Sequence, residues 1–153
     1  MIQIEIPQRG MIELQHAVFD VNGTLAVDGT LIPGVEDQLK RLASQLAIHI
    51  LTAGTHGKLA ELAQSLGYPL QIINSGADKA HYVRQLGAAN VIAFGNGAND
   101  AEMLGLAAIG VAVITTEGVA ASALQAADVL ALGPLDAIDL VLKPKRLVAT
   151  LRA

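Results

Sequence analysis

Asp20 is the first residue of the sequence whose position suggests chemistry. It lies near the end of the apolar run HAVFDV (16–21), which is typical of a buried central strand. Burying a carboxylate is costly unless it is paired with a cation or hydrogen-bonded, so a carboxylate at this place indicates a functional role. The alternative is a turn cap, because the pair Asn22-Gly23 that follows is itself common in turns. Taken alone, the segment leaves both interpretations open.

Thr52 and Lys79 are candidates for binding an anion. Thr52 follows the apolar run AIHIL and precedes Ala53 and Gly54, and a hydroxyl followed by outward-facing backbone N–H groups can hold an anion. A helix cap at Thr55 explains the same residues. Lys79 lies in the first turn of a predicted helix, where the helix dipole disfavours a cation. Its position therefore indicates an anion nearby, unless the side chain is simply solvated.

The segment GNGAND (95–100) adds two further polar groups, Asn96 and Asp100, after the apolar run NVIAF. It is similar to a glycine-rich dinucleotide-binding loop, but Asp100 replaces the third glycine of that motif and the segment lies late in the chain. We therefore reject dinucleotide binding and retain both residues as candidates for a site where a strand ends.

Cysteine and histidine usage limits the metal chemistry that is possible. The absence of cysteine excludes a disulfide, a thiolate nucleophile and a cysteine-based zinc site, and is compatible with the cytoplasm. The four histidines have no metal-ligand spacing. His49 alternates with Ile48 and Ile50, which favours a structural role, whereas His56 follows Thr52 closely enough to approach a substrate.

A parallel sheet would bring the candidate residues together. Short apolar runs alternate with amphipathic stretches, the pattern of βαβ units. Helices should cover both faces of the sheet, and reactive groups should gather beyond the carboxyl ends of its strands. The pattern predicts a hairpin from 2–6 and 11–14, a small flap at 24–28, and strands at 16–21, 47–51, 70–73, 90–94, 109–113 and 128–132. It predicts helices from 33 to about 46, at about 58–66, and at 78–86, 99–106, 119–126 and 135–142.

Length and composition fit a single domain spanning 1–153. The apolar content of 52% is sufficient for one core. No apolar run reaches the roughly 20 residues of a membrane span, and the start MIQIEIPQRG does not have the pattern of a signal peptide. A net charge of −4 disfavours nucleic acid and acidic membranes as partners. The basic C-terminal tail (143–153) predicts either an anion-binding patch or a solvated helix face.

Taken in order, these segments resemble the four motifs of the haloacid dehalogenase superfamily. The motifs are strand-DxxGT, strand-T, helix-K and strand-GNGxND, spread over about 16–106. The flanking segments FDVNGTLAVDG, LIPGVEDQL, HILTAGTHG, AFGNGANDAEML and LVLKPKRLVATLR are similar to the small P-type-ATPase-like members of that superfamily. The resemblance implies a Rossmannoid α/β fold of three layers, with a central parallel sheet between two layers of helices.

The resemblance also implies a stepwise phosphoryl transfer. Asp20 is then the nucleophile that becomes an aspartyl phosphate. Mg²⁺ is then held by Asp20, by the backbone carbonyl of Asn22 and by Asp100 directly or through a water, with Asn96 nearby.

The remaining candidates would bind the phosphoryl group of a small phosphorylated substrate. Thr52 and the N–H groups of Gly23 and Ala53 would hold its oxygens, and Lys79 would neutralise their charge. Thr24 and Thr52 are only 28 positions apart, so no cap domain fits between them. An open site is covered either by a large substrate or by a neighbouring subunit, and the resemblance implies the second, because capless relatives of this size often form homo-oligomers.

Two asparagines depart from the superfamily pattern. Asn22 replaces the Asp that usually acts as general acid and base, and an amide cannot exchange a proton at neutral pH. Asn96 replaces a second Asp, which weakens metal binding. The hypothesis is therefore a slow phosphatase with a long-lived aspartyl phosphate, and the alternative is a non-catalytic or regulatory module that binds phosphate and metal. An ATP-hydrolysing unit detached from a pump is a third possibility, but the chain lacks room for a nucleotide-binding insert.

Overall fold

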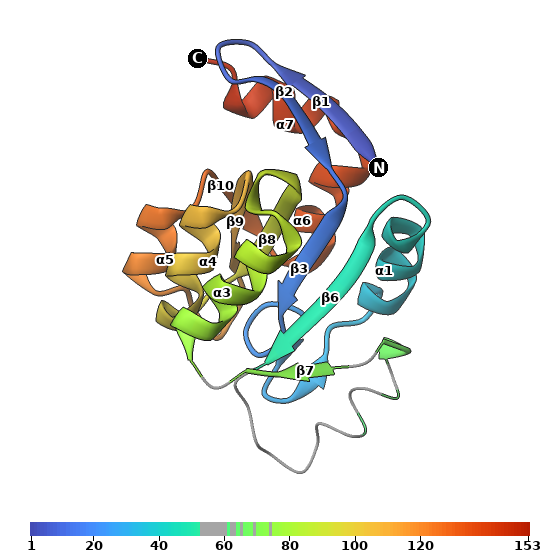
Figure 1. Ribbon diagram of the computed structural model, residues 1–153. Helices are drawn as coiled ribbons and strands as arrows, with labels where there is room; N and C mark the ends of the chain where they lie inside the picture. The colour runs from blue at the N-terminus through green and yellow to red at the C-terminus, as the bar shows by residue number, and fades with distance from the viewer. Residues whose placement is uncertain (53–60, 62–63, 65, 69, 74) are drawn as a thin grey trace.

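The computed structural model describes residues 1–52, 61, 64, 66–68, 70–73 and 75–153. A six-stranded sheet runs through its centre in the order β10-β9-β8-β3-β6-β7, and neighbouring strands are parallel (Figure 1). The strands are β3 (His16–Asp20), β6 (Ala47–Thr52), β7 (Leu70–Ile72), β8 (Val91–Gly95), β9 (Ile109–Ile114) and β10 (Val129–Leu132). The chain adds strands on one side of β3 and then on the other, so the strand order reverses at β3. In such sheets the crevice at the reversal point is the usual place for a site.

Helices cover both faces of the sheet, as the alternating pattern predicts. The helices α1 (Val35–Ala43) and α6 (Pro134–Leu142) pack on one face. The other face carries α3 (Gly76–Leu86), α4 (Ala101–Leu106) and α5 (Ala121–Ala126) (Figure 1). Short 3₁₀ turns, η1 (Ala88–Asn90) and η2 (Ala98–Asp100), precede β8 and α4. The helix expected at about 58–66 lies largely outside the described residues.

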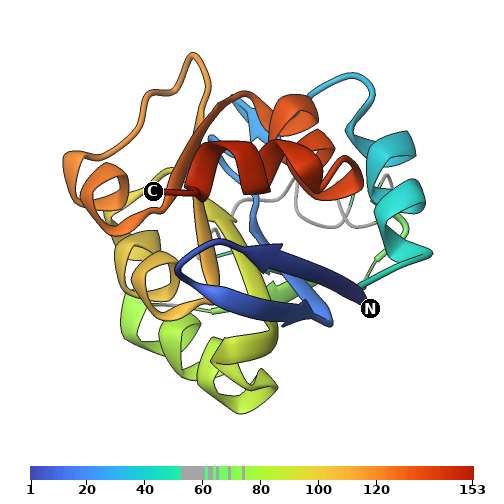
Figure 2. The same ribbon diagram turned by 90° about the horizontal axis from the view of Figure 1, so that it is seen from above.

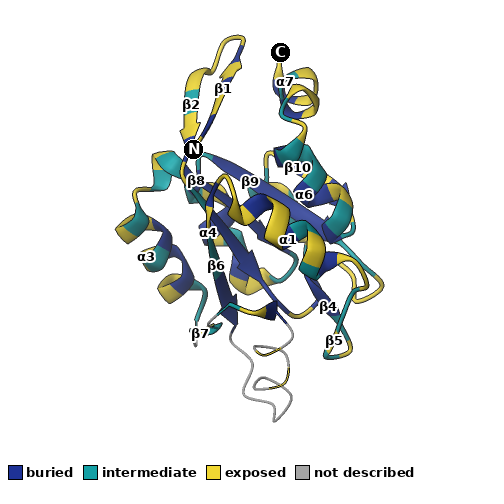
Figure 3. Cartoon of the chain, turned by 90° about the vertical axis from the view of Figure 1, so that its right-hand side faces the viewer, coloured by how far each residue is buried: buried dark blue, intermediate teal, exposed yellow. Residues whose placement is uncertain are grey.

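The strands are apolar throughout because both of their faces are buried. Side chains alternate across a strand, so Ala17 and Phe19 of β3 join the core beneath α1 and α6, while Val18 joins the core beneath α3, α4 and α5. Phe19 stacks on Phe94 of the neighbouring β8, with ring centroids 4.3 Å apart. Figure 3 shows the strands as the buried centre of the molecule, while the outward face of α1 is exposed.

An antiparallel hairpin precedes the sheet, as predicted. It consists of β1 (Ile2–Ile6) and β2 (Gly10–Leu14). Seen from above, the hairpin lies beside the C-terminal helix α7 (Lys145–Leu151), and the two share one apolar core (Figure 2). The expected flap is a second small antiparallel pair, β4 (Ala26–Val27) with β5 (Thr30–Leu31). All residues between Thr24 and Thr52 are described, and β4, β5, α1 and β6 fill this interval without a cap domain.

The basic C-terminal tail is partly neutralised within the fold. Lys143 lies 2.6 Å and Arg146 lies 3.5 Å from the Asp139 carboxylate of α6. These ion pairs favour the solvated helix face over an anion-binding patch. Among the described residues, no helix is long and apolar enough to cross a membrane.

Candidate active site

The four motifs converge at the carboxyl edge of the sheet. Asp20 ends β3, and the loop after the adjacent β8 carries Asn96 and Asp100. Lys79 reaches the same place from the first turn of α3, which begins two residues earlier than predicted, after the N-cap residue Ser75. The sequence-based expectation that these residues share one rim of the sheet is consistent with this arrangement.

Lys79 is the centre of the site. Its Nζ donates hydrogen bonds of 2.7 Å to Oδ1 of Asp20 and of 2.7 Å to Oδ1 of Asp100. Lys79 and Asp100 are 0% exposed and Asp20 is 6% exposed. Ionised groups are tolerated at this depth only when they are paired. The cluster contains two carboxylates and one ammonium, so its net charge is negative when all three are ionised. A net negative charge favours binding of a cation over binding of an anion.

Asp100 is held on both of its oxygens. While Lys79 binds Oδ1, the backbone N–H groups of Asn96 and Gly97 donate to Oδ2 over 3.0 and 2.9 Å. Gly95 permits this close packing, because a Cβ at that position would lie 2.6 Å from Cγ of Asp100. Asp100 therefore orients Lys79 and closes its own loop.

Thr24 links Asp20, the candidate nucleophile at the end of β3, to the side-chain amide of Asn96 in the loop after β8. Its Oγ1 lies 3.2 Å from Oδ2 of Asp20 and 3.2 Å from Oδ1 of Asn96. A hydroxyl carries one proton and can donate to only one of these oxygens at a time. The Thr24 hydroxyl therefore holds the oxygens of Asp20 and Asn96 near one another.

Gly23 occupies a position that only glycine fills without strain. Its φ of 80° lies in the left-handed region, and an added Cβ would approach Cγ of Asn96 to 2.8 Å. The carbonyl of Gly23 accepts a hydrogen bond of 3.0 Å from Oγ1 of Thr115, beyond β9. The loop after β3 is thus fixed by residues that directly follow β8 and β9.

Sequence reasoning missed the roles of Thr24 and Thr115. The signal for Thr24 was present, since it is the last residue of the DxxGT motif, but its contact with Asn96 depends on how two loops meet. Thr115 lies in a loop without a recognisable motif.

Burial controls the ionisation of the cluster. Burial raises the pKa of Asp20 to about 6; the charge of Asp100 acts in the same direction, and Lys79 opposes both. For Lys79 the largest single influence is burial, which lowers its pKa, but the attraction of Asp20 and Asp100 outweighs burial and the pKa is raised. Lys79 therefore keeps its positive charge across the physiological range.

The structure describes some of the remaining candidate residues from the sequence and not others. Thr52 is buried at the end of β6, one residue beyond the Asp20 and Leu51 pair of the sheet register. Asn22 is exposed beside the flap. Ala53 and His56 lie outside the described residues.

His49 has the structural surroundings that its alternating pattern predicts. Its ring nitrogens lie 3.1 Å from Nδ1 of His16 and 2.9 Å from the Tyr82 hydroxyl. These contacts link β3, β6 and α3.

The donor atoms at the site fit a hard divalent cation. Oδ2 of Asp20 and Oδ1 of Asn96 each lie 3.2 Å from the Thr24 hydroxyl, and both are oxygens of the kind that Mg²⁺ prefers. In the described ranges, no group of three or more histidine, cysteine, aspartate or glutamate side chains is placed to hold a metal. Carboxylate and amide oxygens suit Mg²⁺ better than a transition metal.

Comparisons with known proteins identify the family. The family model described as haloacid dehalogenase-like hydrolase matches residues 30–128. No curated protein matches the chain.

Several solved structures share the fold. A putative hydrolase of this superfamily, subfamily III A, from Legionella pneumophila is 16% identical with a TM-score of 0.70, covering 90% of this chain and 87% of that one. The 3-deoxy-D-manno-octulosonate 8-phosphate phosphatase from Moraxella catarrhalis, in complex with magnesium, phosphate and KDO, is 19% identical with a TM-score of 0.65, covering 91% and 94%. The catalytic domain of the CPx-ATPase CopB-B is 28% identical with a TM-score of 0.60, covering 76% of this chain and 46% of that one.

Proposed function

The chain belongs to the haloacid dehalogenase-like hydrolases, and from this premise we propose that it is a Mg²⁺-dependent phosphohydrolase that forms an aspartyl phosphate on Asp20. The observation that carries the proposal is the buried cluster in which Lys79 bridges Asp20 and Asp100 at the carboxyl edge of the sheet. A carboxylate held this rigidly beside a permanent positive charge is suited to nucleophilic attack on phosphorus.

In the first step, Asp20 attacks phosphorus. A bond forms between the Asp20 carboxylate and phosphorus, and the bond between phosphorus and the leaving oxygen breaks. Lys79 would orient the attacking group through Oδ1, and the third N–H of its ammonium would bind a phosphoryl oxygen. The Thr52 hydroxyl would bind another phosphoryl oxygen. The N–H of Gly23 donates to the carbonyl of Ala26 over 2.7 Å in this structure, so it would have to leave that carbonyl to bind the phosphoryl group. Binding and orientation supply most of the catalysis in phosphoryl transfer.

Mg²⁺ would be held by Asp20, Asn96 and the backbone carbonyl of Asn22, and through a water by Asp100. When bound, it supplies positive charge against the phosphoryl oxygens. The magnesium and phosphate in the Moraxella catarrhalis structure support this part of the proposal. With only two carboxylates in the cluster, we propose that the affinity for Mg²⁺ is low.

In the second step, water attacks the phosphorus of the aspartyl phosphate, releasing inorganic phosphate and the Asp20 carboxylate. An acid at position 22 would protonate the leaving group and then activate this water. The Asn22 amide does neither. Because Asn22 is exposed, solvent reaches this position, and the leaving group takes its proton from solvent. General acid–base help of roughly 10²- to 10⁴-fold is absent, and both steps are slow.

The second candidate function is a non-catalytic or regulatory module that binds phosphate and metal. Asn22 and Asn96 favour it, because both remove acidic groups that turnover would use. In this case the chain binds phosphate with Mg²⁺ but releases no product.

Phosphate release from acetyl phosphate and 4-nitrophenyl phosphate distinguishes the two functions. The phosphohydrolase predicts Mg²⁺-dependent release by the wild-type protein and by Asp37→Asn, an exposed control on α1. Asp20→Asn should release none. Activity that survives Asp20→Asn contradicts the proposed nucleophile, whereas wild-type binding without release supports the regulatory module.

Two further properties belong to this proposal. A cytoplasmic location fits the lack of cysteine. Self-association would cover a site that no cap domain covers between Thr24 and Thr52, and sedimentation velocity would detect it.

A further inference from the structure

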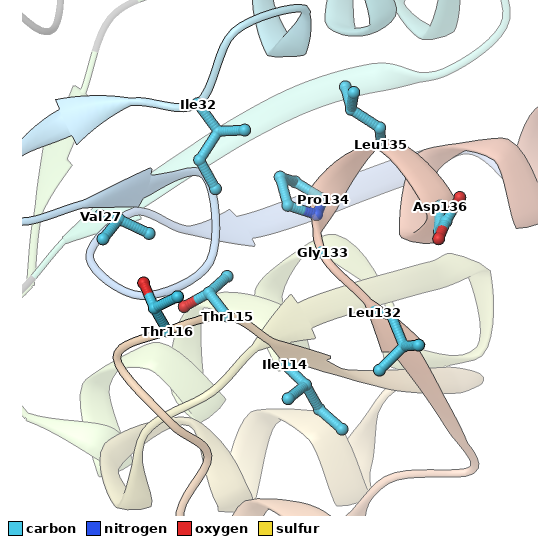
Figure 4. A pocket seen from close by; sticks show the side chains of 10 residues that line it. All are labelled: Val27, Ile32, Ile114, Thr115, Thr116, Leu132, Gly133, Pro134, Leu135 and Asp136. Atoms are coloured by element: carbon cyan, nitrogen blue, oxygen red, sulfur yellow. The ribbon is translucent and has the colours of Figure 1, made fainter.

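A pocket of about 590 Å³ opens between the flap and the ends of β9 and β10. This volume is in the range of small-molecule sites, which is roughly 300 to 1,000 Å³. Figure 4 shows Val27 and Ile32, from the flap side, facing Leu132 and Pro134 across the pocket, with Ile114 and Thr115 along one edge. Of these residues, Thr115 alone contacts the phosphoryl-transfer site described above, through the carbonyl of Gly23.

The pocket borders the loop that carries the nucleophile. Thr115, which lines the pocket, donates its hydroxyl to the carbonyl of Gly23 over 3.0 Å. Val27 lines it from the flap, directly after Ala26, whose carbonyl accepts the N–H of Gly23 over 2.7 Å. The loop containing Gly23 therefore borders both the pocket and the Asp20 site, and a substrate whose phosphoryl group is at Asp20 would reach the pocket past this loop.

The lining indicates what the pocket binds. Its apolar side chains are Val27, Ile32, Ile114, Leu132, Pro134 and Leu135. Among the described residues that line the pocket, Asp136 carries a charge, and none is a lysine, arginine or histidine. Apolar contact favours an uncharged hydrocarbon group, and Asp136 disfavours an acidic one.

We propose that this pocket binds the leaving group of the substrate and that the substrate is an aryl phosphate with no acidic substituent. This inference rests on the proposed function, and it names the substrate class of the same site. In the reaction, the bond from Asp20 to phosphorus forms, the bond from phosphorus to the aryl oxygen breaks, and the aryloxide leaves with the electron pair. An aryloxide is stable enough to leave before solvent protonates it. The absence of a general acid at position 22 therefore slows the hydrolysis of aryl phosphates less than that of phosphates with more basic leaving groups.

Binding of 2-naphthol, measured by methyl NMR, tests the pocket without any turnover. We expect 2-naphthol to shift the methyl signals of Val27, Ile114 and Leu132, and its acidic counterpart 2-naphthoate to bind at least about tenfold more weakly because of Asp136. Unchanged methyl signals, or equal binding of both compounds, would overturn the inference. So would shifts that follow protein concentration alone, since a second copy would then occupy the pocket.

Leu132 and Leu130 give a matched pair of variants. Both are exposed leucines on the same face of β10, at 74% and 49%, but only Leu132 lines the pocket. We expect Leu132→Gln to weaken 2-naphthol binding about fivefold, and to lower by the same factor the ratio of kcat/KM for 2-naphthyl phosphate to that for acetyl phosphate. Leu130→Gln should change neither quantity. Equal effects of both variants would contradict the proposal that the leaving group binds in the pocket beside Leu132.

The two proposals fail in different ways. If neither phosphate is hydrolysed but 2-naphthol still shifts the pocket methyls, the phosphohydrolase is wrong, and the pocket is a site for neutral aromatic compounds. If acetyl phosphate is hydrolysed but 2-naphthol does not bind, the substrate class is wrong and the phosphohydrolase stands.

Discussion

Replacing Lys79 by methionine tests whether the buried cluster exists as described. The change removes the ammonium from between Asp20 and Asp100 while keeping most of the side-chain volume. Both 2.7 Å hydrogen bonds are lost and two carboxylates remain buried without their cation. Breaking a buried ion pair from one side costs about 3 to 5 kcal/mol. For a chain of this size, that lowers the melting temperature by about 6 to 20 °C.

Urea denaturation in the presence of EDTA measures this loss, because the chelator removes any stabilisation by bound metal. Lys40→Met is the matched control. Lys40 also lies 2.7 Å from a carboxylate, that of Glu36, but both side chains are largely exposed, so this variant should unfold close to the wild-type midpoint. Should Lys79→Met cost less than about 1 kcal/mol, the ammonium cannot lie between two buried carboxylates, and the site geometry is wrong.

Three further variants test single features. Asn22→Asp supplies the missing acid and base, so the aspartyl phosphate should hydrolyse roughly 10²-fold faster or more, measured as its decay after removal of the phosphate donor. Gly23→Ala should lower the free energy of unfolding by about 1 to 3 kcal/mol and reduce phosphate release, because of its positive φ and the approach of Asn96. Burial, with the charge of His16, lowers the pKa of His49 in the folded protein below its value in the unfolded chain. The neutral ring therefore contributes stability at a pH above the pKa of the unfolded chain, and this stability is lost as the pH falls. The stability of the wild-type protein relative to His49→Gln, from urea titrations, should therefore decrease from pH 7.5 to pH 5.5.

The sheet could be predicted because its strands are buried on both faces. HAVFDV, NVIAF and IGVAV are nearly continuous apolar runs, and this pattern identifies central parallel strands without knowledge of their partners. The convergence of Asp20, Lys79 and Asp100 follows from the same reasoning, since the carboxyl ends of parallel strands lie at one edge. The sequence left helix α7 open as one of two alternatives for the basic tail, because seven residues after Pro144 carry too little periodic signal to decide between them.

The detailed contacts could not be predicted, because they depend on how loops distant in sequence approach one another. Lys79 was expected to face a phosphoryl group, but its ammonium is shared by two carboxylates. The Thr115 hydroxyl donates a hydrogen bond to the carbonyl of Gly23, which lies 92 positions earlier in the chain. The apolar pocket likewise combines residues from the flap, β9, β10 and the start of α6, which no local pattern connects.

Peptide mass mapping after acid quench tests the central claim most directly. The wild-type protein is incubated with acetyl phosphate and Mg²⁺, and the aspartyl phosphate is preserved by the acid. Asp20 should carry the phosphoryl group, the label should be absent without Mg²⁺, and Asn22→Asp should lose it sooner. A label on any other residue, or none on Asp20 in the wild-type protein, would contradict phosphoryl transfer through this carboxylate.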